Sequence, residues 1–201
     1  MSNVTSKNEL SERDLLLLSN YLYLDNSLEL GAVGNTIDNM RFPDGNFDPS
    51  KLPPARGGMT QEDMIYILNE ISESKGNICD LTVTQTVNEH DIHAACFVNE
   101  QQEATVIYRG TGGTYQAWAD NFSGEYVKET ALQKRADSFI RDECGAYSNI
   151  TVAGHSKGGN FAQLVTTLNG SRIDRCVSFD GQGFNRSYIR SNQVNIRKNR
   201  A

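Results

Sequence analysis

Residues 149–170 read NITVAGHSKGGNFAQLVTTLNG, and this stretch decides the fold. Its first five residues form a short run rich in β-branched side chains, which predicts a buried strand ending near Ala153. Residues 154–158 then match G-x-S-x-G, the pattern that places a serine on a sharp turn between a strand and a helix. Apolar residues recur at helical spacing after the turn, and Gly170 stands where a helix commonly ends. The stretch therefore predicts strand, turn and helix in that order, with Ser156 on the turn.

Gly154 and Gly158 flank the serine for two physical reasons. The turn needs strained backbone angles, and a Cβ at either glycine would collide with the neighbouring strand and helix. The five-residue pattern alone is weak evidence in a chain with 17 glycines, so its setting between a strand and a helix carries the prediction. A glycine-rich turn without chemistry is the alternative.

Ser156 is the candidate nucleophile. A serine hydroxyl attacks a carbonyl only when a positioned base removes its proton, normally a histidine oriented by a carboxylate. The backbone N–H of Lys157 begins the helix and is a candidate donor to an oxyanion, whereas the Lys157 side chain is expected to be a solvated surface charge. The His155 side chain should point away from the serine hydroxyl on such a turn, so we interpret it as a packing residue.

The composition restricts the classes of partner. The 201 residues suffice for one domain with a substantial core. With 19 basic and 25 acidic residues the net charge is −6, which argues against a nucleic-acid partner and against a basic membrane-binding face. No apolar run approaches the roughly 18 residues that cross a bilayer, and the N-terminus lacks the features of a signal peptide.

The cysteines have no C-x-x-C spacing and lie in or beside apolar segments: Cys79, Cys96, Cys144 and Cys176. We expect buried, reduced thiols, and neither a metal nor a cofactor. Reduced thiols and the missing signal peptide favour a cytoplasmic location, with leaderless secretion as the alternative.

The rest of the chain predicts an α/β fold. Helices capped by Ser11 and Thr60 precede strands at 81–87, 92–98 and 104–108, whose tight polar turns favour antiparallel hairpins. A helix around 132–140, stopped by Gly145, leads to the central stretch, and a strand at 173–179 follows it. This order predicts an α/β-hydrolase-type mixed sheet that begins antiparallel and becomes parallel, with helices on both faces.

A second glycine-rich turn follows the strand at 104–108. In a serine hydrolase of this topology, a loop after an earlier strand supplies the second oxyanion donor, and Thr111 is placed to offer its backbone N–H. A plain glycine turn is the alternative. Trp118 lies in the next segment, which is either a lid or a wall of an acyl pocket, or else uses this tryptophan to anchor the core.

Five stretches taken together resemble the bacterial Mbeg1-like proteins, which are α/β-hydrolase relatives of the class 3 (fungal-type) lipases. They are RGT at 109–111, WADNF at 118–122, QKRA at 133–136, GHSKGGN at 154–160 and FDGQGF at 179–184. The resemblance runs from about residue 11 to residue 188. It implies Ser156 as the nucleophile, Thr111 and Lys157 as oxyanion residues, and lipid or other esters as substrates. It also implies a structural role for Arg109, and a turn at Asp180 that lies near the site without supplying the acid.

The chain departs from the hydrolase pattern after the nucleophile. In α/β-hydrolases the serine is followed by Asp or Glu and then by His, but the histidines of this chain are His90, His93 and His155. We therefore expect residues 1–201 to form a single domain that lacks the C-terminal strands, with residues 187–201 as a polar basic tail.

Two hypotheses about function follow. In the first, the chain carries the nucleophile of an esterase or lipase, and the acid and base come from an absent C-terminal segment or a second chain; alone, the chain would be inactive or nearly so. In the second, it is a non-catalytic α/β-hydrolase-like module that serves binding or assembly.

Overall fold

The computed structural model describes residues 9–25, 37–74, 77–89 and 91–199. Within them, five strands form one sheet in the order β1-β2-β3-β4-β5. The strands are β1 (Thr82–Glu89), β2 (Ile92–Val98), β3 (Ala104–Tyr108), β4 (Ile150–His155) and β5 (Ile173–Phe179). The pairs β1–β2 and β2–β3 are antiparallel, and the pairs β3–β4 and β4–β5 are parallel. The prediction of a sheet that changes from antiparallel to parallel is confirmed.

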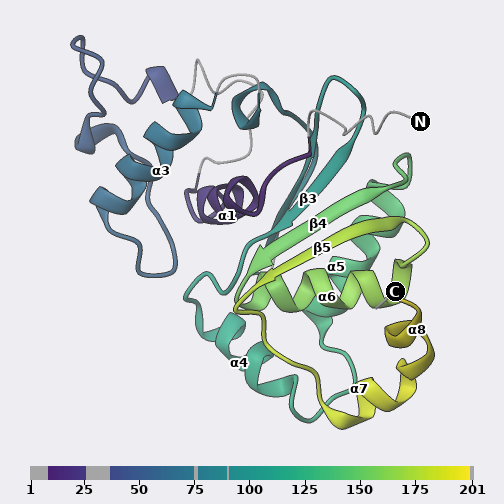
Figure 1. The fold of residues 1–201 in the computed structure, drawn as a ribbon. Helices are drawn as coiled ribbons and strands as arrows, with labels where there is room; N and C mark the ends of the chain where they lie inside the picture. The colour runs from purple at the N-terminus through teal and green to yellow at the C-terminus, as the bar shows by residue number, and fades with distance from the viewer. Residues whose placement is uncertain (1–8, 26–36, 75–76, 90, 200–201) are drawn as a thin grey trace.

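Helices cover both faces of this sheet (Figure 1). Helices α1 (Glu12–Tyr21) and α3 (Gln61–Glu73) lie on one face, and α5 (Ala131–Ser138) and α6 (Lys157–Asn169) on the other. Successive residues of a strand point to opposite faces. Accordingly, Phe97 and Ile107 pack in the core under α1 and α3, while Cys96 and Val106 pack in the core under α5 and α6. Strands β2 and β3 are buried along their whole length, which explains their continuous apolar sequences.

The predicted helix starts are confirmed by their caps. The Ser11 and Thr60 hydroxyls accept the backbone N–H groups of Asp14 and Asp63, whose carboxylates accept the cap N–H groups in return. These reciprocal bonds satisfy donors that a helix leaves unpaired at its start. Thr130 and Gln133 form the same arrangement at α5.

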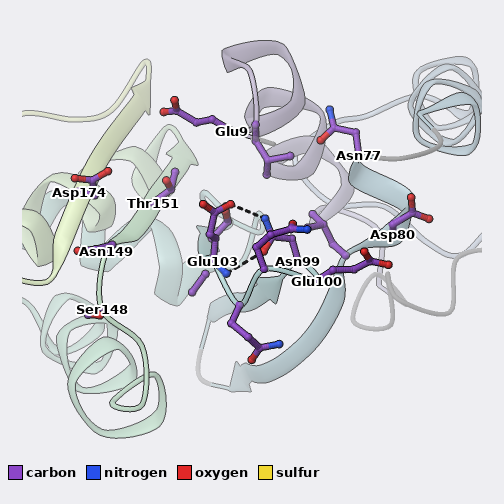
Figure 2. Close-up of a pocket in the computed structure, with 16 residues that line it drawn as sticks. Glu9, Asn77, Asp80, Asn99, Glu100, Glu103, Ser148, Asn149, Thr151 and Asp174 are labelled. Carbon is purple, nitrogen blue, oxygen red and sulfur yellow. Dashed lines mark hydrogen bonds between the residues drawn. The ribbon is translucent and has the colours of Figure 1, made fainter. Parts of the chain in front are cut away.

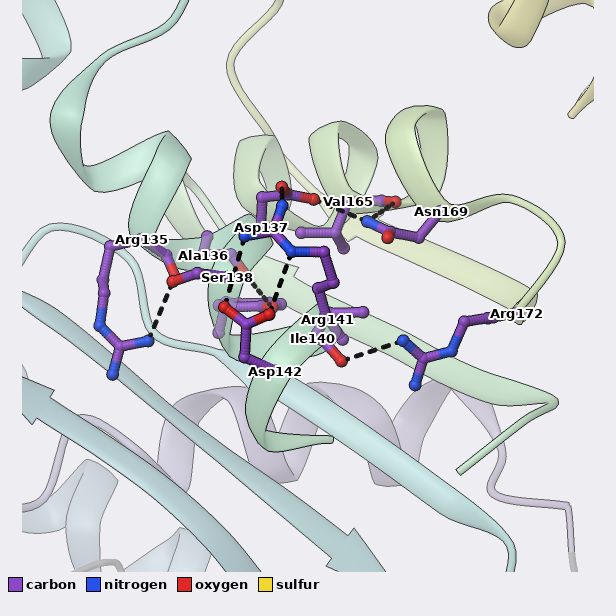
Figure 3. Close-up of polar contacts among 11 residues, drawn as sticks. Arg135, Ala136, Asp137, Ser138, Ile140, Arg141, Asp142, Val165, Asn169 and Arg172 are labelled. Carbon is purple, nitrogen blue, oxygen red and sulfur yellow. Dashed lines mark hydrogen bonds and ion pairs between the residues drawn. The ribbon is translucent and has the colours of Figure 1, made fainter. Parts of the chain in front are cut away.

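The helical segment that begins with α5 stops before Gly145 as predicted, but its last turn is not α-helical. Helix α5 continues as a π-helical turn at Phe139–Glu143, which hydrophobic spacing cannot distinguish from an α-helix. Polar contacts brace this turn (Figure 3). Arg141 pairs with Asp137 at 2.9 Å, and the Arg172 guanidinium donates to the carbonyls of Ile140 and Cys144. Arg172 thereby ties the start of β5 to the end of the helix on its face.

The C-terminal residues lie against α6. Two short helices, α7 (Arg186–Ser191) and α8 (Gln193–Lys198), occupy the part of the chain that we expected to be a polar basic tail. Gly170 does not form a left-handed cap, since its φ is −52°, and a Cβ at this position would have only the exposed Asn199 side chain to displace.

Candidate active site

Ser156 occupies the turn between β4 and α6. Its φ of 55° and ψ of −120° lie outside the helical and extended regions and are unusual for any residue other than glycine. The Ser156 N–H donates to the Phe179 carbonyl at 2.8 Å, and its own carbonyl accepts the Asn160 N–H at 3.1 Å. The strained conformation is therefore held from both β5 and α6. The conformation predicted for Ser156 is confirmed, while its role as a nucleophile stays a prediction.

The two flanking glycines let the turn approach the neighbouring strand. A Cβ on Gly158 would collide with the Tyr108 carbonyl oxygen of β3, and a Cβ on Gly154 would lie 2.6 Å from the same oxygen. Real Cβ atoms do not tolerate such distances, so a larger residue at position 158 must displace the backbone of β3, and one at position 154 the backbone of α6 and β3. The collision predicted from the sequence is thus observed at both glycines.

The Lys157 side chain corrects one expectation. It is buried, with 5% of its side chain exposed, and its ammonium lies 3.0 Å from the Asp120 carboxylate, which is 11% exposed. The interpretation of Lys157 as a solvated surface charge is wrong, because a carboxylate 37 positions earlier pairs with it inside the protein. The Lys157 backbone N–H is the first in α6, so no carbonyl within the helix accepts it. It donates to none of the other described residues.

The loop at residues 109–113 runs beside the turn. A Cβ on Gly110 would lie 2.6 Å from the His155 carbonyl oxygen and 3.2 Å from the Ser156 Cβ. This contact brings the next residue, Thr111, into the neighbourhood of the serine. The Thr111 hydroxyl accepts a hydrogen bond of 2.8 Å from the Asn121 side chain. Convergence of the Thr111 and Lys157 amides on one oxyanion stays a prediction.

Helix α4 (Tyr115–Ser123) supplies both Asp120 and Asn121. Trp118, on the same helix, is 52% exposed, so the interpretation of this tryptophan as a core anchor is wrong. Tyr115 and Phe122 are also exposed, at 88% and 66%. The sequence signal for Asp120 and Asn121 was their place in the WADNF stretch, but no pattern along the chain indicated what they contact.

The described histidines both have partners other than Ser156. The His155 ring lies 3.2 Å from the Tyr23 hydroxyl and meets the Tyr23 ring edge-on, which supports its interpretation as a packing residue. The His93 ring is buried and accepts a hydrogen bond of 3.0 Å from Arg109. Burial and the neighbouring guanidinium lower the His93 pKa to about 4, so this ring is neutral at physiological pH. His90 lies outside the described residues.

Cavities flank the turn on both sides. One, of about 550 Å³, is lined by Asn121, Lys157, Asn160 and the chain at 182–186. The other, of about 450 Å³, lies between α1 and α3 and reaches Tyr23 and His155. Burial raises the Tyr23 pKa, so its hydroxyl stays protonated. Lys157 lines the first cavity and His155 the second, so each cavity reaches a residue next to Ser156, which itself lines neither.

A third cavity, of about 730 Å³, lies at the opposite edge of the sheet (Figure 2). Its lining includes Thr105, Thr151 and Asp174, at or near the amino ends of the parallel strands, whereas Ser156 follows the carboxyl end of β4. Ligands of open α/β sheets bind at the carboxyl ends of the strands. This cavity is therefore not part of the candidate site.

Within the described ranges, no helix is long and apolar enough to cross a membrane, and no group of side chains has the composition of a metal site. The cysteines are free thiols, of which Cys96 and Cys144 are buried and Cys79 and Cys176 partly buried.

Comparison with known protein families gives a match over more than half of the chain. The family model described as Mbeg1-like matches residues 79–201, which include β1 to β5, the turn at Ser156 and α4. No curated protein and no solved structure matches the chain significantly.

Proposed function

The chain belongs to the Mbeg1-like family, a lipase-like α/β-hydrolase family, and on this premise we propose that it is a serine hydrolase that acts on carboxylic esters. Ser156 is the proposed nucleophile, and the backbone N–H groups of Thr111 and Lys157 are the proposed oxyanion hole. Lipid esters and other esters remain equally compatible with the two cavities beside the turn.

The chemistry follows from this assignment. The Ser156 hydroxyl loses its proton to a base and attacks the ester carbonyl, whose oxygen becomes an oxyanion held by the two N–H groups. The intermediate expels the alcohol, which takes the proton from the base. Water then hydrolyses the ester bond between the acyl group and Ser156 and releases the carboxylic acid. His93 and His155 are engaged by Arg109 and Tyr23, so we assign the base to neither and place it outside the described residues.

One observation carries the proposal: Ser156 keeps a strained conformation that costs on the order of 1–3 kcal/mol. A turn with no function would relax by placing a glycine at that position, as it already does at both flanking positions. The close approach of Gly110 to Ser156 supports the proposal too, because Thr111, the proposed second donor, is the next residue of that loop.

The test is labelling of Ser156 with a fluorophosphonate, together with hydrolysis of p-nitrophenyl esters. We expect slow labelling and weak turnover from residues 1–201, because loss of triad members leaves only about 10³–10⁴-fold acceleration over water. Both signals should disappear in Ser156→Ala and persist in Ser72→Ala, whose hydroxyl bonds within α3. Robust turnover lost in Ser156→Ala and in His90→Ala would place the base within this chain.

A non-catalytic binding module is the second candidate. The Ser156 hydroxyl makes no hydrogen bond within the described part of the chain, where His155 and His93 bond to Tyr23 and Arg109 instead. Identical signals from the unsubstituted protein and Ser156→Ala, for both the label and the ester, would favour this candidate over a hydrolase.

A further inference from the structure

Two consecutive residues of α4 hold the side chains of the two proposed oxyanion residues. The Asp120 carboxylate pairs with the Lys157 ammonium at 3.0 Å, and the Asn121 amide donates to the Thr111 hydroxyl at 2.8 Å. Thr111 and Lys157 lie on different segments of the chain, 46 positions apart. Among the described side-chain contacts, these two connect Thr111 and Lys157 to the same helix, α4.

Further contacts fix this part of α4. Asp120 also accepts a hydrogen bond of 2.9 Å from the Thr130 hydroxyl, at the start of α5. The α4 cap residue Thr114 donates to Asp91 at 2.6 Å, in the turn between β1 and β2. Helix α4 is therefore tied to the sheet at its first turn and to α5 and α6 near its end.

We propose that Asp120 and Asn121 are positioning residues that set the geometry of the oxyanion hole through the Lys157 and Thr111 side chains. The proposal rests on the proposed function for its catalytic meaning, but the positioning itself is a property of the free protein. It makes α4 the element whose placement decides whether the two donors converge.

The physical reason is the narrow tolerance of an oxyanion hole. Donors act at about 2.7–3.1 Å from the oxyanion, and a misplacement of about 1 Å costs up to about 10²-fold in rate. Thr111 lies in a glycine-rich loop, between Gly110 and Gly112, and glycine adds backbone freedom. A hydrogen bond from Asn121 restricts that freedom, and the buried ion pair restricts the first residue of α6 against α4.

The experiment measures backbone order in the ligand-free protein by ¹⁵N relaxation. In the unsubstituted protein we expect order parameters near 0.85 at Thr111 and Lys157, and in Asn121→Leu a fall below about 0.6 at Thr111 alone. Asn121→Asp, whose carboxylate accepts the Thr111 hydroxyl proton, should restore the order. Thr111→Val removes the same hydrogen bond and should lower the order parameter at position 111 as much as Asn121→Leu does. The double variant should show no further fall. Gln116→Ala, an exposed change on the same helix, is the control.

The second arm adds butaneboronic acid at saturating concentration, because its tetrahedral adduct with Ser156 is expected to be weak where the base is missing. We expect it to shift the Thr111 and Lys157 amide resonances, with the Thr111 shift reduced at least 5-fold in Asn121→Leu. Order at Thr111 that is the same in Asn121→Leu, Thr111→Val and Gln116→Ala would overturn the positioning proposal. A change in order with no boronate shift in the unsubstituted protein would instead support positioning and count against the proposed hydrolase function.

Discussion

The Lys157 ammonium and the Asp120 carboxylate form an ion pair 3.0 Å apart in which neither side chain is more than 11% exposed. Removal of one partner from such a pair leaves a buried, uncompensated charge, which costs about 3–5 kcal/mol. We therefore expect Asp120→Asn to lower the free energy of unfolding by about that amount. Urea denaturation followed by circular dichroism measures the change.

The ion pair of Asp38 and Arg41 offers a matched control, because the Asp38 side chain is 70% exposed. Exposed pairs contribute about 0–1 kcal/mol, so Asp38→Asn should change little. In the background of Lys157→Met, Asp120→Asn should cost far less than in the unsubstituted protein. Equal losses in both backgrounds would contradict the stabilising role of the pair.

Gly158→Ala tests the contact between the turn and β3. The new methyl group would collide with the Tyr108 carbonyl oxygen, which is backbone and cannot move without disturbing the sheet. We expect a loss of about 3 kcal/mol or more, at the upper end of overpacking. Gly183→Ala is the control, since its Cβ would meet nothing within 4 Å. A thermal melt of Gly158→Ala that matches that of Gly183→Ala would refute the steric argument.

Ser156→Gly tests the strain on the turn. With φ at 55° and ψ at −120°, glycine should fit this position better than any residue with a Cβ. We expect Ser156→Gly to be more stable than Ser156→Ala by about 1 kcal/mol, although glycine loses more entropy on folding. Both variants lack the hydroxyl, so their difference in denaturation midpoint reports the strain that glycine relieves, less the extra entropy that glycine loses on folding. Equal midpoints would mean that the strain at this position is no larger than the entropy that glycine loses on folding.

His93 should make stability depend on pH. Its pKa falls from 6.5 to about 4 on folding, mainly through burial and then through Arg109. Between these values the unfolded chain binds a proton that the native protein does not, so stability decreases as pH falls from about 6.5 to about 4. The shift corresponds to on the order of 3 kcal/mol over this window. Below about pH 4 both states are protonated, and the contribution of His93 stays constant.

His93→Gln keeps an acceptor for Arg109 but cannot titrate. We expect the stability difference between the unsubstituted protein and His93→Gln to shift by the stated amount between pH 7 and pH 4, as measured by urea denaturation. Carboxylates titrate equally in both proteins and cancel in the comparison. A difference that stays constant with pH would show that His93 titrates normally.

Local sequence predicted the sheet well and the side-chain contacts of the site poorly. Strands β2, β3 and β5 have the predicted bounds, because polar turns delimit mainly apolar runs at β2 and β3, and Gly170 and Gly181 lie just outside β5. The conformation of Ser156 was predictable because glycines mark the turn within five residues. The burial of Lys157 was not, since it depends on Asp120, which lies on another helix. Trp118 was ambiguous for the same reason: whether an aromatic residue is covered is decided by segments far away in the chain.

Helix α4 is held mainly by polar contacts, and Ala117 is its only fully buried residue. Detachment of this helix from the sheet would therefore expose little additional apolar surface. Heat-capacity change and denaturant sensitivity both scale with newly exposed surface. Opening of α4 should thus have a small heat-capacity change and respond weakly to urea. As the urea concentration rises, the amide exchange rate in α4 should stay nearly constant, while the rates in β2 and β3 increase. Urea should therefore unfold the sheet while leaving the frequency with which α4 detaches almost unchanged.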